Sequence, residues 1–118
     1  MAGVARADLF LLKPGFEDPA FPGQIYFDRY SALLEGVIAS FPILRDRLRV
    51  HRVEFERPRA EVAALAGEAN QTLPRLVLPA GAVSAHAVSE HGGRQSIAGV
   101  SAVIAALVDL YGIVPPHP

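Results

Sequence analysis

The sequence contains no cysteine, a residue on which several kinds of protein chemistry depend. Without cysteine the chain has no disulfide bond, no thiolate nucleophile and no cysteine-ligated zinc site. Thiol–disulfide exchange is therefore excluded as an activity of this chain by itself, because the attacking group in that reaction is a thiolate.

The sequence also lacks an excess of charge of either sign. Its formal net charge at pH 7 is −1, with 11 basic and 12 acidic residues mixed along the chain. A protein that binds nucleic acid or an anionic membrane by electrostatic attraction normally shows a basic patch or run. We therefore expect neither nucleic acid nor membrane as a partner.

Long hydrophobic runs are absent as well. The first apolar run, Leu9–Leu12, is too short for the core of a signal peptide, so we expect a cytoplasmic protein. The most apolar segment is Ile97–Val114, which carries one charge, at Asp109, and two glycines. It is shorter than the ~20 apolar residues that a membrane-spanning helix needs, and we interpret it as a buried helix.

The composition that remains is typical of a folded domain. Of the 118 residues, 51% are hydrophobic and 19% are charged, which is too apolar for a disordered chain. This length is sufficient to bury one core, so we expect a single domain over residues 1–118. The proline-rich tail, residues 115–118, is expected to be flexible.

The patterns of apolar residues, proline and glycine predict alternating strands and helices of an α/β domain. Strands are predicted at Ala7–Lys13, Leu48–Phe55, Arg75–Pro79 and Ala82–Val88. The charges of the second of these are typical of an edge strand. Helices are predicted from Asp28–Ser31 to Phe41, over Pro58–Glu68, and from Val100 to Gly112. The first helix is expected to bury Leu33, Leu34, Val37, Ile38 and Phe41, while Pro14–Gln24 and Ser89–Ser96 are predicted loops.

This order of elements, with Leu73-Pro74 directly before the third strand, resembles the thioredoxin-like fold. The resemblance implies a four-stranded mixed sheet of order 2-1-3-4, flanked by three main helices. The first two strands would be parallel, and the last two antiparallel to their neighbours. It also implies a cis peptide bond between Leu73 and Pro74, a conformation that X-Pro bonds adopt at low cost.

More narrowly, the chain resembles a bacterial family of small thioredoxin-like proteins of unknown function. The likeness rests on "LFLLKPGFEDPAFPGQ", "ALLEGVIASFP", "NQTLPRLVLPAG" and the terminal "PPHP". Some members of that family carry a Cys-x-x-Cys-like pair at the start of the first helix. Asp28 and Ser31 occupy the corresponding positions here, so the resemblance implies no redox activity.

Three interpretations of Asp28–Ser31 are open. The first is helix capping, because Asp and Ser side chains accept hydrogen bonds from free N–H groups at a helix start. The second is a binding groove between this helix start and the turn that precedes the third strand, suited to a peptide-like or glutathione-like ligand. The third is a small glutathione-dependent transferase or isomerase, in which the hydroxyl of Tyr30 or Ser31 polarises the ligand thiol.

We favour a non-catalytic binding or interaction module, with glutathione as a possible ligand and no other cofactor. The candidate ligand-binding residues share positions at or near the expected groove: Tyr26, Asp28, Arg29, Tyr30, Ser31, Thr72, Leu73, Pro74 and Ser96. Ser96 is included because the resemblance implies a polar residue at the start of the last helix, where it would otherwise be a simple N-cap.

The remaining polar residues form no metal motif. The four histidines, at positions 51, 86, 91 and 117, show no pairing at helical spacing, so no metal site is predicted, although His86, Glu90 and His91 could approach one another. The loop Pro14–Gln24 carries Phe16 and Phe21, which either fold onto the sheet or form a partner surface. We expect a homodimer.

Overall fold

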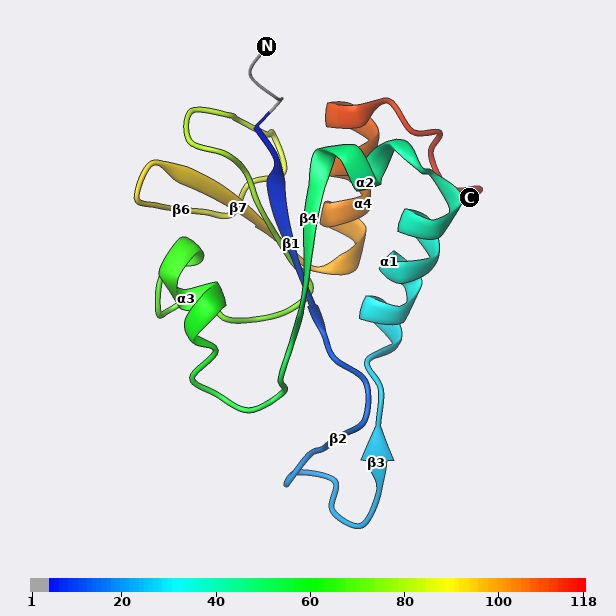
Figure 1. The fold of residues 1–118 in the computed structure, drawn as a ribbon, viewed down its shortest axis with the longest axis vertical. Helices are drawn as coiled ribbons and strands as arrows, with labels where there is room; N and C mark the ends of the chain where they lie inside the picture. Colours follow the sequence, from blue (N-terminus) through cyan, green and yellow to red (C-terminus); the bar gives the residue numbers. More distant parts are fainter. Residues whose placement is uncertain (1–4) are drawn as a thin grey trace.

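Strand β1 (Ala7–Leu12) lies at the centre of the fold, and its first five residues are buried. The structure is a computed structural model that describes residues 5–118. In it β1 pairs in parallel with β4 (Leu48–Val53) and antiparallel with β5 (Arg75–Val77). Strands β7 (Arg94–Ala98) and β6 (Ser89–His91) follow, which gives a mixed five-stranded sheet of order β4-β1-β5-β7-β6 (Figure 1).

Helices cover both faces of this sheet (Figure 1). One face packs against α1 (Arg29–Ser40), α2 (Ile43–Arg47) and α4 (Val100–Tyr111), and the other carries α3 (Ala60–Ala66). Successive side chains of a strand point to opposite faces. Leu9 and Leu11 of β1 therefore join the core beneath α1 and α4, while Phe10 joins the smaller core beneath α3.

A short two-stranded ribbon extends from the sheet after β1 (Figure 1). It consists of β2 (Phe16–Glu17) and β3 (Ile25–Tyr26), paired antiparallel. The Phe16 ring stacks on Phe55, which follows β4, with ring centroids 4.5 Å apart. The expected loop Pro14–Gln24 is therefore partly strand, and Phe16 packs inward whereas Phe21 is 65% exposed.

The prediction of a four-stranded sheet and three main helices is wrong, because residues 5–118 form a sheet of five strands and four helices. Residues 82–88 form turns and irregular backbone, not the predicted fourth strand. The expected loop Ser89–Ser96 instead forms the β6–β7 hairpin. Gly92 and Gly93 make its turn with φ of +57° and +77°, and glycine adopts two successive positive φ values without steric cost.

The helix boundaries also differ in part from those expected. Helix α3 begins at Ala60, so Pro58 lies before the helix and not in its first turn. In α1, Leu34 and Ile38 are buried as expected, but Leu33 is 47% exposed. The peptide bonds preceding Pro58 and Pro74 are both cis, and the second of them is the one that the resemblance to the thioredoxin-like fold implied. Over residues 5–118, no helix combines the length and apolar character needed to cross a membrane.

Candidate functional site

Asp28 and Ser31 are engaged with each other and with the end of β1. The Asp28 carboxylate accepts hydrogen bonds from the Ser31 backbone N–H (2.9 Å) and the Ser31 hydroxyl (2.7 Å). The Ser31 oxygen in turn accepts the Leu12 backbone N–H at 3.0 Å. Asp28 is the N-cap of α1, and Ser31, which is 2% exposed, links that helix to β1.

The other predicted residues near this helix start do not converge on one cavity. The Tyr26 hydroxyl donates to the Phe21 carbonyl at 2.9 Å. Arg29 and Tyr30 lie exposed in the first turn of α1. Leu73 packs against the core beneath α3, and Pro74 is buried. These positions are therefore occupied by local contacts or open to solvent.

Thr72 and Ser96 are both hydrogen-bonded to Arg75, a residue that the sequence analysis did not select. The Arg75 guanidinium donates to the Ser96 hydroxyl (2.7 Å) and to the Thr72 hydroxyl (2.9 Å) and carbonyl (3.2 Å). Burial lowers the pKa of Arg75, which is 3% exposed. Ser96 lies on β7, not at the start of α4, whose N-cap is Gly99, so its predicted position was wrong.

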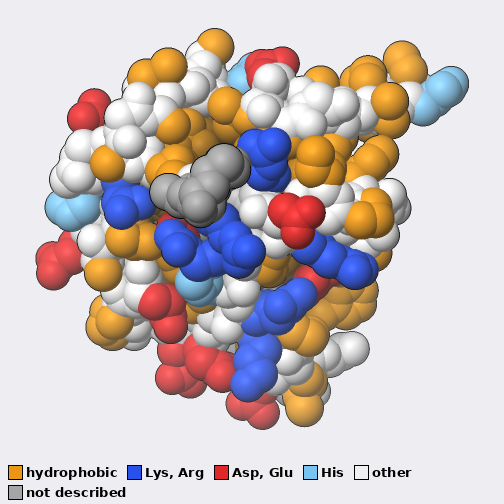
Figure 2. Space-filling view, turned by 45° about the horizontal axis from the view of Figure 1, so that its top comes forward, with side chains coloured by type: hydrophobic (Ala, Val, Ile, Leu, Met, Phe, Trp, Pro, Cys, Tyr) orange, Lys and Arg blue, Asp and Glu red, His pale blue; other side chains and the backbone are white. Residues whose placement is uncertain are grey.

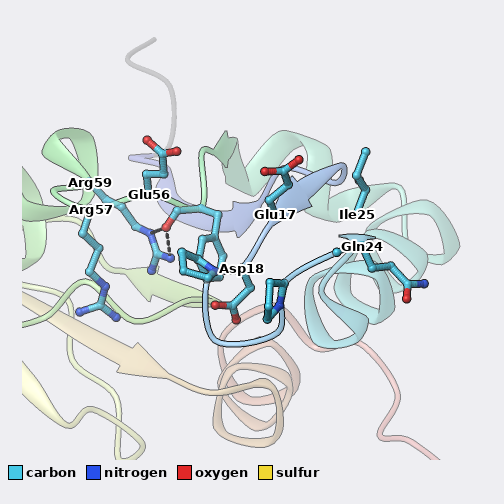
Figure 3. Close-up of a pocket in the computed structure, with 11 residues that line it drawn as sticks. Glu17, Asp18, Gln24, Ile25, Glu56, Arg57 and Arg59 are labelled. Carbon is cyan, nitrogen blue, oxygen red and sulfur yellow. Dashed lines mark hydrogen bonds between the residues drawn. The ribbon is translucent and has the colours of Figure 1, made fainter.

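A pocket of about 1230 Å³ lies elsewhere, between the β2–β3 ribbon and the segment that follows β4 (Figure 3). It contains none of the nine predicted residues, and its lining consists of Glu17, Asp18, Pro19, Pro22, Gly23, Gln24, Ile25, Phe55, Glu56, Arg57 and Arg59. The two segments follow the carboxyl ends of the parallel strands β1 and β4. Ligands of open α/β sheets characteristically bind beyond the carboxyl ends of parallel strands.

Arg59 is a buried cation in the wall of this pocket, with 5% of its surface exposed. Its Nε and Nη2 groups donate to the Phe55 carbonyl, and its Nη1 group donates to the Gln71 carbonyl at 2.7 Å. Burial and the neighbouring charge of Arg57 lower the pKa of Arg59. Within the described part of the chain, no carboxylate forms an ion pair with it.

The pocket separates charges of opposite sign. Figure 3 shows Arg57 and Arg59 on one side, and Glu17, Gln24 and Ile25 on the other. Asp18, which lies between these two sides, accepts the Ala20 backbone N–H at 2.9 Å and so stabilises the loop of the ribbon. Glu56 also lies on the arginine side, but its carboxylate points away from both guanidinium groups (Figure 3). A ligand in this pocket therefore meets the two arginines on one side and Glu17 on the other.

A second charged cluster lies on the α3 face of the sheet, near the start of β1. The buried Asp8 carboxylate accepts hydrogen bonds from Arg49 Nε (3.0 Å) and Nη2 (3.4 Å), and lies 2.8 Å from His51 Nε2. Phe10 stacks on the His51 ring at 4.6 Å. Figure 2, which looks toward this end of the molecule, shows Lys and Arg side chains gathered beside a His side chain.

The charge of Asp8 is compensated within the chain. Burial raises the pKa of Asp8, but the hydrogen bonds and positive charges of Arg49 and His51 outweigh burial, so its net pKa lies below 3.8. The Arg49 side chain is half exposed and keeps its contact with water. The cluster is a complete ion-pair network that joins β1 to β4.

The remaining histidines do not form the cluster that the sequence suggested. His86 Nε2 lies 2.9 Å from a carboxylate oxygen of Asp109 in α4, not beside His91 and Glu90. Across residues 5–118, no three His, Cys, Asp or Glu side chains gather closely enough to hold a metal ion.

Comparison with known families identifies a match over most of the chain. The model of a family described as "Protein of unknown function (DUF3088)" matches residues 6–115, which is nearly the whole chain. No curated protein matches the sequence, and no solved structure matches it either.

Proposed function

The chain belongs to the DUF3088 family of proteins of unknown function, and we propose that it is a thioredoxin-like binding module without thiol–disulfide chemistry. Its ligand site would be the pocket between the ribbon and the Phe55–Arg59 segment, not the groove expected at Asp28–Ser31. The thioredoxin-like assignment is supported by the order β4-β1-β5-β7, with the first pair parallel and the next two antiparallel.

The observation that carries this proposal is the character of the pocket lining. It offers cations, acids and an apolar surface from Pro19, Pro22, Ile25 and Phe55. A short peptide-like ligand such as glutathione presents the matching groups. The lining contains no thiol, hydroxyl, imidazole or amine side chain, and its charged groups are guanidinium groups and carboxylates, which suit recognition of a charged ligand.

Thermal unfolding in the presence of reduced glutathione and S-methylglutathione tests the proposal. A ligand that binds only the folded state stabilises it and so raises the melting temperature. A free ligand concentration of 100 times the Kd adds roughly 2.7 kcal/mol to the free energy of unfolding. We expect both compounds to raise it, because the thiol is not needed. No shift with either compound at millimolar concentration would refute a glutathione-like ligand.

A pair of matched variants locates the binding. Ile25 lines the pocket and is 65% exposed, whereas Val83 is 69% exposed and lies outside the lining. We expect Ile25→Glu to reduce the ligand-induced shift and Val83→Glu to leave it unchanged. Equal shifts in both variants would place the ligand elsewhere.

A glutathione-dependent transferase or isomerase is the alternative function. It requires the hydroxyl of Tyr30 or Ser31 to reach the ligand thiol. The Ser31 hydroxyl donates its single proton to Asp28, which counts against that residue, while Tyr30 is 48% exposed on α1. The rate at which glutathione is conjugated to an electrophile, measured for wild type and Tyr30→Phe, tests this alternative. A lower rate in the variant would support a transferase or isomerase, and no measurable rate in wild type would count against it.

We also propose that the chain forms a homodimer through the exposed face of α1. Seven residues of this helix are exposed and only Arg29 among them is charged. The exposed apolar residues are Tyr30 and Leu33 of α1 and Ile43 of α2, whose exposed fractions are 44–48%. Gly36 faces open space, because a Cβ built on it would meet no atom of another part of the chain within 4 Å. A second copy fits such a face, because two antiparallel helices could approach closely at Gly36 and cover each other's apolar residues.

Light scattering coupled to size-exclusion chromatography measures this association. We expect a dimeric mass for wild type and for Val83→Glu, and a monomeric mass for Leu33→Glu, which places a charge in the centre of the face. A monomeric wild type would refute the homodimer.

A further inference from the structure

We infer that Arg57 and Arg59 form a carboxylate-binding subsite, and that Glu17 on the opposite side of the pocket binds a protonated amine. The ligand would then be a short peptide or peptide-like compound with both charged ends free. This inference rests on the proposed function, and it specifies the charged groups that the pocket recognises.

The first argument is the burial of Arg59 without a counter-ion. Taking a charge out of water is costly unless an opposite charge or strong hydrogen bonds replace the lost solvent. A guanidinium has five N–H groups, and the bonds to Phe55 and Gln71 use three of them. Both acceptors are neutral carbonyls, and the guanidinium carbon lies 5.6 Å from the centroid of the Phe55 ring, which is also uncharged. The positive charge can therefore still pair with an anion in the pocket.

Arg57 strengthens this side of the pocket. It is exposed, lines the same pocket, and takes part in no ion pair with another residue of the described chain. Figure 3 shows the Glu56 carboxylate directed away from both guanidinium groups. A carboxylate placed here can accept charge-assisted hydrogen bonds from two arginines, which are about twice as strong as neutral ones.

The opposite side favours an amine over a second anion. The Asp18 carboxylate already accepts the Ala20 N–H, whereas Glu17 is exposed and forms no ion pair within residues 5–118. Glu17 and Asp18 would repel a ligand with negative charge at both ends, such as a bisphosphate. A compound with one carboxylate and one distant ammonium group matches both sides of the pocket.

S-methylglutathione and two derivatives test the inference. One derivative carries an amide in place of the glycine carboxylate, and the other carries an N-acetyl group on the amine. Titration calorimetry compares their affinities for wild type, Arg57→Gln and Glu17→Gln. Arg45→Gln serves as a matched control, because Arg45 is an exposed arginine outside the pocket lining.

We expect amidation to weaken binding to wild type and Arg45→Gln by about tenfold or more, since a hydrogen-bonded charge pair is lost. In Arg57→Gln the amide should be disfavoured less strongly than in wild type, because Arg59 alone is left to pair with the carboxylate. Acetylation should show the corresponding pattern with Glu17→Gln. Unchanged melting temperatures would show that these exposed substitutions leave the fold intact.

Failure of the proposed function and failure of this inference give different results. If S-methylglutathione does not bind wild type, the proposed function fails, and this inference fails with it. If the parent and both derivatives bind equally well, the pocket binds the ligand but does not recognise its charged ends, and only this inference is overturned. If Arg57→Gln still discriminates against the amide as strongly as wild type does, the carboxylate subsite is wrongly placed.

Discussion

Asp8 and Arg59 are both buried charges, but the chain compensates only one of them. Asp8, near the start of β1, has Arg49 and His51 as charged partners on the neighbouring strand. Arg59, which follows β4 at the opposite end of the strand pair, has backbone carbonyls and the Phe55 ring as partners, but no carboxylate among residues 5–118. The first arrangement is complete and stabilises the sheet, whereas the second leaves a positive charge that a ligand can neutralise.

Removing the compensated charge should have the largest effect. We expect Asp8→Ala to lower the free energy of unfolding by about 2–3 kcal/mol, because the hydrogen bonds of the buried Asp8 carboxylate to Arg49 and His51 are lost. Urea unfolding at pH 7 measures the change. Asp46→Ala removes an exposed acid as a control and should cost under about 0.5 kcal/mol. Equal losses in the two variants would show that the Asp8 network does not stabilise the fold.

The polar groups of Ser31 are also fully paired within the chain, and we expect their removal to have the second-largest effect on the free energy of unfolding. Ser31→Ala leaves the buried Leu12 N–H without its acceptor and removes a donor to Asp28. We expect a loss of about 2 kcal/mol in the free energy of unfolding. Tyr30→Phe, one residue earlier and half exposed, should change it by under about 0.5 kcal/mol. A negligible loss for Ser31→Ala would contradict the structural role given to its hydroxyl.

The Asp8 network should also make stability depend on pH. The pKa of Asp8 lies below its ordinary value of 3.8, so the folded state favours the ionised carboxylate. The stabilisation is fully present above that ordinary value and is lost as pH falls through the lower folded-state pKa. The difference in unfolding free energy between wild type and Asp8→Asn should therefore shrink as pH falls from 5 toward 3. A difference that grows between pH 5 and pH 3 would reverse the assigned direction.

The smallest effect on stability is expected at the uncompensated site. Arg57 is exposed and unpaired among residues 5–118, so Arg57→Gln should change the free energy of unfolding by under about 0.5 kcal/mol. Its loss should appear only in ligand affinity. A large destabilisation, measured by the same urea titration, would mean that Arg57 serves the fold and not a ligand.

The sequence predicted the parts of the fold that depend on local apolar patterns. The continuous apolar run at Ala7–Leu12 indicated a central strand, and β1 lies inside the sheet. The charged residues of Leu48–Val53 indicated an edge strand, and β4 lies at one edge of the sheet. The β6–β7 hairpin was missed because its strands are short and polar. The apolar alternation of Ala82–Val88 gave a stronger strand signal, although those residues form turns.

The pocket could not be located from sequence because its two sides are about 30 residues apart along the chain. The β2–β3 ribbon reaches the segment after β4 only through the pairing of β1 with β4 and the stacking of Phe16 on Phe55. The unusual length of Pro14–Gln24 was the one available signal. The residues next to Arg59 in the sequence do not indicate that its guanidinium is buried, because contacts with Phe55 and Gln71 in the folded chain cause that burial.

Chemical-shift mapping with S-methylglutathione tests the central claim most directly. The claim is that a ligand binds between the ribbon and the Phe55–Arg59 segment without thiol chemistry. Titration of the ¹⁵N-labelled protein should perturb amide signals of residues 17–25 and 55–59 and leave those of residues 28–31 unchanged. Perturbations centred on residues 28–31 and 72–75 would instead place the site at the helix start and contradict the account.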